Sequence, residues 1–231
     1  MKLGGLQETS LLDYPGKISA IVWTVGCNFR CPFCYNQNMV YGETETIPID
    51  HIFSFLDKRV GKLDALSITG GEPLLHEDIT DFLKKVKQRG FLVKVDTNGT
   101  YPDRLSQLLE ENLIDYVSMD VKAPVEKYDT LAGVHVDLDL IDSSIKLIMD
   151  KALDYEFKTT MIPGLLEKSD AVKIASWIKG AKRYCLQQFK IDVPVINQSI
   201  LSCSKQFTKQ DFVDMKKQVS PLVDSCLLRG V

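Results

Sequence analysis

Three closely spaced cysteines are the residues of this sequence best suited to metal chemistry. Cys27, Cys31 and Cys34 stand close together, and cysteine thiolates bind iron–sulfur clusters or zinc. An iron–sulfur cube normally takes four thiolates, so three without a nearby fourth indicate a cluster with one open iron. Pro32 disfavours a regular helix here, so we expect a loop that wraps the metal. A zinc site with a distant fourth ligand and three reduced core thiols are the alternative interpretations.

A second pattern, Gly70-Gly71-Glu72-Pro73, directly follows an apolar run. Glycines let the backbone approach a ligand closely, and a carboxylate accepts hydrogen bonds from an ammonium group. The pattern therefore indicates a binding turn for a ligand that carries an amino group. A tight strand-to-helix turn without a ligand would also explain the two glycines.

Two acidic segments follow further along the chain, Asp96-Thr97-Asn98-Gly99 and Ser118-Met119-Asp120-Val121-Lys122. Strand alternation places Ser118, Asp120 and Lys122 on one face, and neighbouring strand ends would bring Asp120 close to Asp96. Two carboxylates at that place need a cation. Neutralisation of a buried acid by Lys122, or two solvated caps, are the competing interpretations.

The elements that position these residues follow from hydrophobic periodicity, because apolar β-branched runs alternate with segments of helical period. Right-handed crossovers would curl the six β/α units into an α/β fold, a partly open (β/α)6 barrel with its site at the carboxyl ends of the strands. The predicted strands are Ile18–Val25, Ala65–Thr69, Leu92–Asp96, Tyr116–Val121, Phe157–Ile162 and Phe189–Val193. The predicted helices are Ile49–Arg59, Ile79–Arg89, Arg104–Asn112, Leu140–Lys151, Ala171–Arg183 and Thr208–Val219. No linker or repeat interrupts this order, so we predict a single domain over residues 1–231.

Composition sets the limits on function. The chain has 231 residues, 45% of them hydrophobic and 26% charged, which is typical of a globular protein. A formal net charge of −3 disfavours a dedicated nucleic-acid binder. The longest apolar stretch, Ile18–Val25, is too short to cross a bilayer, and the start has no apolar signal core, so we expect a cytoplasmic protein without membrane contact. The remaining cysteines, predicted to be buried free thiols, are Cys185, Cys203 and Cys226.

The spacing Cys-x3-Cys-x2-Cys, with Phe33 before the last cysteine, resembles the signature of the radical S-adenosylmethionine (SAM) superfamily. The resemblance implies a 4Fe-4S cluster on Cys27, Cys31 and Cys34. It also implies that SAM chelates the open iron and is cleaved reductively to a 5'-deoxyadenosyl radical, with no catalytic residue beyond the cluster and the SAM site. Gly70-Gly71-Glu72-Pro73 is similar to the GGE motif of that superfamily, which holds the SAM amino group.

The two acidic segments resemble those of glycyl-radical-enzyme activases, and the likeness continues through Tyr128–Gly133 and Met161–Gly164. It implies a monovalent cation beside the SAM carboxylate. The implied cation ligands are Asp96, Thr97, Asp120 and the carbonyl of Ser118. The implied SAM contacts beyond the GGE motif are Asn98, Lys122 and Lys158. Lys158 stands where those relatives carry an arginine, which keeps the charge but loses the bidentate fork.

The opening Leu12–Lys17 looks most like the activating proteins of anaerobic ribonucleoside-triphosphate reductase. This resemblance implies an anaerobic oxidoreductase that abstracts a hydrogen from a glycine of a partner enzyme, with a flavodoxin- or ferredoxin-like electron donor. Three alternatives stay open. They are a small-molecule radical SAM enzyme similar to the carboxy-deazaguanine synthases, an activase of another glycyl radical enzyme such as pyruvate formate-lyase, and a non-enzymatic iron–sulfur or zinc protein.

Overall fold

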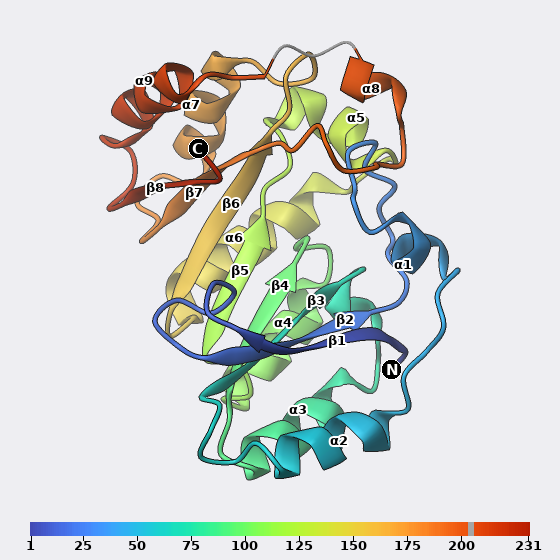
Figure 1. Ribbon diagram of the computed structural model, residues 1–231. Helices are drawn as coiled ribbons and strands as arrows, with labels where there is room; N and C mark the ends of the chain where they lie inside the picture. The colour runs from blue at the N-terminus through green and yellow to red at the C-terminus, as the bar shows by residue number, and fades with distance from the viewer. Residues whose placement is uncertain (203–205) are drawn as a thin grey trace.

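A computed structural model describes residues 1–202 and 206–231, which build an α/β fold around one eight-stranded sheet (Figure 1). The strands lie in chain order, β1 pairs antiparallel with β2, and every pair from β2 to β8 is parallel. β1 and β8 form the two edges, so the sheet is a partial barrel, as predicted. The strands are β1 (Leu3–Ser10), β2 (Ser19–Thr24), β3 (Ala65–Gly70), β4 (Leu92–Thr97), β5 (Tyr116–Asp120), β6 (Tyr155–Met161), β7 (Tyr184–Gln188) and β8 (Cys226–Arg229).

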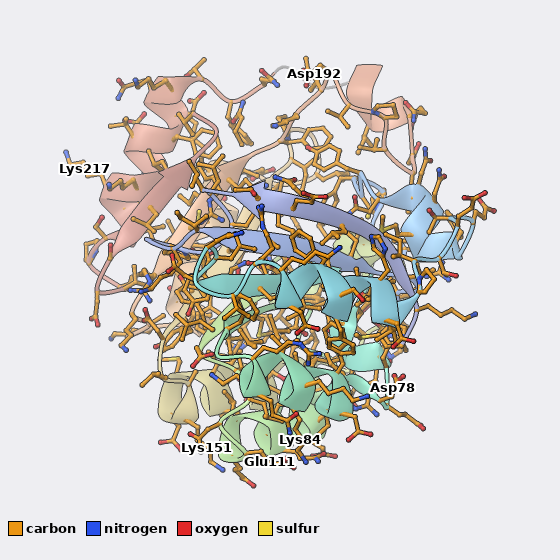
Figure 2. The ribbon with its side chains drawn as sticks, turned by 60° about the horizontal axis from the view of Figure 1, so that its bottom comes forward. Asp78, Lys84, Glu111, Lys151, Asp192 and Lys217 are labelled. Carbon is orange, nitrogen blue, oxygen red and sulfur yellow. The ribbon has the colours of Figure 1, made fainter. Side chains whose placement is uncertain are left out.

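Helices connect the parallel strands and project charged side chains outward, among them the ion pair of Lys84 and Glu111 (Figure 2). Within the described ranges, no helix is both long and apolar enough to pass through a membrane. The α-helices are α1 (Gln37–Tyr41), α2 (Ile49–Asp57), α3 (Ile79–Gln88), α4 (Pro102–Glu110), α5 (Tyr128–Ala132), α6 (Leu138–Lys151), α7 (Lys168–Trp177), α8 (Ser199–Ser202) and α9 (Lys209–Val219). Two 3-10 turns are η1 (Pro73–Leu75) and η2 (Val125–Lys127).

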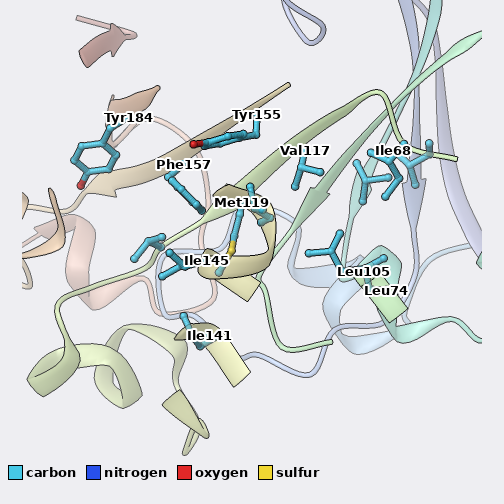
Figure 3. Close-up of a cluster of buried hydrophobic side chains, with 14 of the residues drawn as sticks. Ile68, Leu74, Leu105, Val117, Met119, Ile141, Ile145, Tyr155, Phe157 and Tyr184 are labelled. Carbon is cyan, nitrogen blue, oxygen red and sulfur yellow. The ribbon is translucent and has the colours of Figure 1, made fainter. Parts of the chain in front are cut away.

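The helix-facing side of the sheet is apolar because alternate strand residues point to it. Val117 and Met119 of β5 are fully buried against helix residues such as Leu105 and Ile145 (Figure 3). Burial of these large side chains at about 25 cal/mol per Å² of apolar surface drives the packing of the helices on the sheet. The same alternation turns Ser118 and Asp120 toward the inside of the barrel.

The loop between β1 and β2 closes the amino end of the barrel. Tyr14 is buried there, with its ring centroid 5.6 Å from that of Tyr116, and it packs in a small cluster with Ala65 and Leu92. Ala65, Leu92 and Tyr116 are the first residues of their strands. The segment Leu12–Lys17 therefore lies at the end of the barrel opposite to the cysteines that follow β2.

The sixth predicted strand is wrong. Phe189–Val193 lies outside the sheet, and β7 is instead Tyr184–Gln188, paired in parallel with β6. The alternation of apolar residues after β7 resembles a strand, but Phe189 is fully buried in a segment outside the sheet, and Ile191 is 42% exposed. The predicted helix Ala171–Arg183 is too long, since α7 ends at Trp177.

The early end of α7 and the failure to predict the two edge strands also have physical explanations. α7 has its C-cap at Ile178, and the left-handed φ of +85° at Gly180 prevents a helix from continuing to the predicted end at Arg183. β1 and β8 were not predicted, because neither has the continuous apolar run of a buried strand. β1 is half-exposed, and β8 spans only Cys226–Arg229. Cys185 and Cys226 are buried free thiols, as predicted, whereas Cys203 lies outside the described residues.

Candidate active site at the carboxyl end of the sheet

A cavity of about 220 Å³ opens where the parallel strands end, and it gathers residues from the cysteine motif, the GGE motif and both acidic segments. Ser118 is the predicted site residue that does not line it. Thr160 of β6 and Gln187 of β7 line it without having been predicted. The predicted site residues that line it are Cys27, Cys31, Cys34, Gly70, Gly71, Glu72, Asp96, Thr97, Asn98, Asp120, Lys122 and Lys158.

The cysteine segment is a loop, as Pro32 predicts, and its three thiols face the cavity. Burial raises the pKa of Cys27 to about 11 and that of Cys31 to about 12. Thiols held this deeply ionise only when a cation stabilises the thiolate, as a bound metal does. The soft donor set therefore suits iron. Across residues 1–202 and 206–231, no three His, Cys, Asp or Glu side chains form a ready-made metal-ion site.

The two glycines of the GGE motif let the end of β3 touch the start of the cysteine loop. A Cβ on Gly71 would lie 1.9 Å from the carbonyl oxygen of Gly26, and one on Gly70 would lie 2.5 Å from the backbone nitrogen of Thr24. Gly70 also has a φ of +111°, which L side chains avoid. The backbone N–H of Glu72 donates to the carbonyl of Gly26 at 2.8 Å. Backbone packing by itself thus requires glycine at both positions.

Helix α5 and the glycine that follows it pack directly against the cysteine loop. The N–H of Arg30 donates to the carbonyl of Ala132 at 2.8 Å. Gly133 has no room for a side chain, because a Cβ there would lie 2.1 Å from the carbonyl oxygen of Arg30. The segment Tyr128–Gly133, singled out by its sequence, therefore acts as a platform for the loop.

The segment after β7 covers the other side of the loop. The N–H of Asn197 donates to the carbonyl of Pro32 at 2.8 Å, and the hydroxyl of Tyr35 accepts from the N–H of Lys190 at 2.7 Å. The ring of Tyr35 also stacks on that of Phe189, with centroids 5.8 Å apart. The segment predicted as a sixth strand therefore holds the cysteine loop in place through the ring of Phe189 and the backbone of Lys190.

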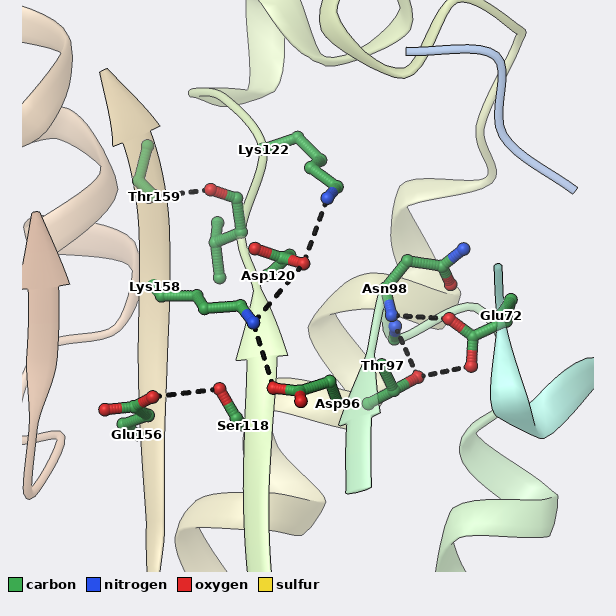
Figure 4. A network of polar contacts seen from close by, with 12 residues as sticks. Glu72, Asp96, Thr97, Asn98, Ser118, Asp120, Lys122, Glu156, Lys158 and Thr159 are labelled. Carbon is green, nitrogen blue, oxygen red and sulfur yellow. Dashed lines mark hydrogen bonds and ion pairs between the residues drawn. The ribbon is translucent and has the colours of Figure 1, made fainter. Parts of the chain in front are cut away.

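Glu72 connects the GGE turn to the end of β4. Its carboxylate accepts a hydrogen bond from the N–H of Leu74 at 2.9 Å. It also accepts from the N–H of Asn98 and the hydroxyl of Thr97, at 2.7 and 2.8 Å (Figure 4). Burial raises the pKa of Glu72 to about 7, although these three donors and Lys122 favour its charged form. The side chain is thus a structural brace as well as part of the cavity wall.

Asn98 connects β4 to the cysteine loop. Its amide nitrogen donates to the side-chain oxygen of Asn28 at 2.8 Å, and the amide of Asn28 donates to the hydroxyl of Thr100 at 2.9 Å. Because Asn28 directly follows Cys27, these contacts tie the start of the cysteine loop to the end of β4 and help to fix the distance between the thiols and the strand ends. This contact explains why an amide follows Asp96-Thr97.

The inner face carries a line of alternating charges that leads to the cavity. Lys94 donates to Asp96 at 2.7 Å. Lys158 donates to the same carboxylate at 2.9 Å, while Asp120 lies 3.0 Å from Lys122 and 3.9 Å from Lys158 (Figure 4). Burial opposes the charge on Asp96, but the two ammonium groups outweigh it and hold the pKa of that carboxyl well below its usual range. Likewise, Asp120 and Asp96 overcome the burial of Lys158 and raise its pKa.

Deeper in the barrel, Ser118 and Glu156 form a second polar layer. The hydroxyl of Ser118 donates to Glu156 at 3.0 Å, and Arg229 of β8 pairs with the same carboxylate at 3.1 Å. Sequence reasoning missed Lys94, Glu156 and Arg229. Lys94 could have been found, because it stands two residues before Asp96 on the same strand face. Glu156 and Arg229 are 73 positions apart, and nothing in the sequence pairs them.

Comparisons with known proteins agree with this geometry. The family model described as the radical SAM superfamily matches residues 21–178. A Methanocaldococcus jannaschii protein named as a glycyl-radical enzyme activating enzyme is 34% identical over 193 residues, which cover 81% of this chain and 80% of that protein. A 7-carboxy-7-deazaguanine synthase of Thermoplasma acidophilum is 35% identical over 114 residues, 49% of this chain and 52% of that protein.

Among solved structures, Streptococcus suis SuiB bound to precursor peptide SuiA covers 90% of this chain with a TM-score of 0.68 and 14% sequence identity. The chain spans about half of SuiB, 47% of its length, and the likeness concerns the fold. The family match covers more than half of the chain, and the archaeal relative extends over most of it. This chain therefore belongs to the radical SAM superfamily and is a radical SAM enzyme.

Proposed function

We propose that this enzyme activates a glycyl radical enzyme. Cys27, Cys31 and Cys34 would hold a 4Fe-4S cluster, and SAM would bind in the cavity beside them. The observation that carries the proposal is the shared cavity, in which three thiols face the charged strand ends. When bound, the cluster supplies the electron that splits SAM into methionine and a 5'-deoxyadenosyl radical, which takes a hydrogen atom from a glycine Cα of the partner.

The residues of the chain would position SAM and exclude water. The proposed SAM contacts are Gly70, Gly71, Glu72, Asn98, Lys122 and Lys158. Lys122 is suited to the SAM carboxylate because its ammonium lies at the cavity wall, 5.9 Å from the centroid of the Phe33 ring and beside the thiols. A monovalent cation on Asp96, Thr97, Ser118 and Asp120 stays a prediction, and the contacts of Lys158 bear on it below.

We further infer that the partner is an anaerobic ribonucleoside-triphosphate reductase and that a flavodoxin- or ferredoxin-like protein supplies the electron. Two features support this: the likeness of Leu12–Lys17 to that group of activating proteins, and the match to an activating enzyme over 81% of the chain. The deazaguanine synthase of Thermoplasma acidophilum matches only 49%. A cytoplasmic location, the absence of a nucleic-acid partner and a single domain over 1–231 stay predictions from the sequence.

Electron paramagnetic resonance tests this function. The reconstituted, reduced enzyme is mixed anaerobically with SAM and the anaerobic ribonucleotide reductase of the same genome. We expect a glycyl radical signal that needs SAM. If 5'-deoxyadenosine forms without that signal, the partner is wrong, and pyruvate formate-lyase and a deazaguanine precursor are the next substrates to test. If neither forms on a fully assembled cluster, the proposed reaction is refuted.

The cysteine ligands are tested by comparing two thiols of similar burial. Cys31→Ala should lose the cluster absorbance and all SAM cleavage, because Cys31 faces the cavity. Cys185→Ala is the matched control, since Cys185 is a buried free thiol of β7 that does not line the cavity. It should retain its iron content and its activity. Wild-type iron content in Cys31→Ala would contradict the ligand assignment.

A further inference from the structure

Lys158 occupies the place where a monovalent cation is expected. Its ammonium nitrogen lies 2.9 Å from an oxygen of Asp96 and 3.9 Å from an oxygen of Asp120. Figure 4 shows the side chain reaching from β6 between the two carboxylates. The distance to Asp96 is that of a charge-assisted hydrogen bond. The gap between the two acids is thus bridged by a positive charge that belongs to the chain.

The other ends of both carboxylates also carry ammonium groups. Lys94 donates to Asp96 from the interior side, and Lys122 donates to Asp120 from the cavity side. Lys94 and Asp96 are almost fully buried, with side-chain exposures of 5% and 12%. Three ammonium groups therefore face two carboxylates, and a metal cation in the middle would add a further positive charge.

Such an addition is unfavourable on electrostatic grounds. Like charges a few ångströms apart repel strongly where water is excluded, and an uncompensated buried charge is costly. The Thr97 hydroxyl, one of the predicted ligands, already accepts the backbone N–H of Gly99 at 3.1 Å, so part of its capacity to bind a cation is in use. The residues present therefore do not fit a bound monovalent metal ion at this position.

We propose that Lys158 is a built-in cation, a positioning residue whose ammonium replaces a monovalent metal ion between Asp96 and Asp120. SAM binding by this enzyme then needs no K⁺ or Na⁺. The proposal rests on the SAM site proposed above, but its first test requires neither cluster nor SAM. It follows that a metal ion can bind between Asp96 and Asp120 only in a variant whose residue 158 carries no positive charge.

The first experiment compares thermal unfolding of the cluster-free protein in KCl, NaCl and choline chloride at equal ionic strength. The wild type should unfold at the same temperature in all three salts. Lys158→Met should open a cation site, so that K⁺ or Na⁺ raises its midpoint by about 2 °C or more over choline. A saturable K⁺- or Na⁺-specific rise in the wild type would overturn the proposal. The measurement on the wild type decides the question even if Lys158→Met does not fold.

The second experiment measures SAM affinity calorimetrically on the reconstituted enzyme in the same salts. For the wild type, the SAM affinity should be the same in K⁺ as in choline. The same independence of salt is expected for Lys158→Arg, which keeps the positive charge. Lys158→Met should bind at least tenfold more weakly in choline and recover in K⁺, while the exposed Lys173→Met serves as the control. A tenfold dependence of wild-type affinity on K⁺, or no recovery of Lys158→Met, refutes the exchange. If the wild type binds no SAM in any salt, the proposed function fails, and the unfolding experiment still decides the role of Lys158.

Discussion

The two faces of the parallel sheet follow opposite rules. The face toward the helices is apolar, with fully buried residues such as Val95, Met119 and Phe157. The inner face carries Lys94, Asp96 and other charged groups on the same strands. Strand alternation separates the two sets by a single residue position. The helix-facing side stabilises the fold by burial of apolar surface, whereas the inner side is a network of paired charges that shapes the site.

This difference shows where stability and function reside in the molecule. Apolar burial is non-directional and tolerates small shifts, but a buried ion pair is favourable only when every member has its partner. The charges of the inner face therefore serve the site rather than the stability of the sheet. Variants on the two faces should respond differently to pH, and that response tests the comparison.

The largest loss of stability should come from the helix-facing side. Phe157→Ala removes a ring that is fully buried and packs 5.5 Å from the ring of Tyr155. Its free energy of unfolding should fall by about 3–5 kcal/mol, equally at pH 5 and pH 8, because no charge is involved. Val213→Ala, at a 43% exposed position, is the control and should change it by less than about 0.5 kcal/mol. Urea unfolding measures both, and a strong pH dependence for Phe157→Ala would contradict the comparison.

A smaller, pH-dependent loss is expected on the inner face. Asp96→Asn leaves two ammonium groups without their carboxylate and should cost about 3 kcal/mol at pH 7. Because the folded-state pKa of Asp96 lies below its usual value of 3.8, its contribution is complete above that pH. It is lost as the pH falls through the folded value. The difference from the wild type should shrink in acid, with the exposed Asp224→Asn as the control. A difference that is constant down to acid pH would argue against the ion pairs.

Glu72 should show the opposite sign. Burial raises its pKa from 4.5 to about 7, so the folded cluster-free protein binds more protons than the unfolded chain between these values. Its contribution to stability is then complete below pH 4.5 and is lost as the pH rises through 7, about 3 kcal/mol in all. Glu72→Gln should remove this slope between pH 5 and 8. Parallel pH curves for wild type and variant would show that the carboxylate is not perturbed.

The smallest effect is expected for ion pairs outside the barrel. Lys151 pairs with Glu110 at 2.7 Å, but both side chains are exposed, and Figure 2 shows Lys151 on the outer surface. Water and salt screen such pairs. Lys151→Met should therefore leave the urea midpoint unchanged within error, in contrast to substitutions at Lys158. A marked fall in the urea midpoint would show that exposed and buried ion pairs contribute equally to the stability of this protein.

Sequence reasoning succeeded where a pattern is local. Five strands follow from short-range periodicity, the cysteine loop follows from Pro32, and the GGE motif stands at a strand end. It failed at Phe189–Val193, where the buried Phe189 packs against Tyr35 of the cysteine loop rather than in the sheet. A pattern of alternating residues cannot tell these two kinds of burial apart, because both remove the side chain from water.

The sequence by itself determined the family signature, the order of strands and helices, and the residues that meet at the carboxyl end of the sheet. Each depends on spacing within a few residues. Only the tertiary structure decided which charges pair. Asp96 and Lys158 are 62 positions apart, and their contact depends on the parallel register of β4, β5 and β6. Ion pairing requires distances of about 3 Å between groups that the chain brings together only on folding, so the built-in cation is a property of the fold.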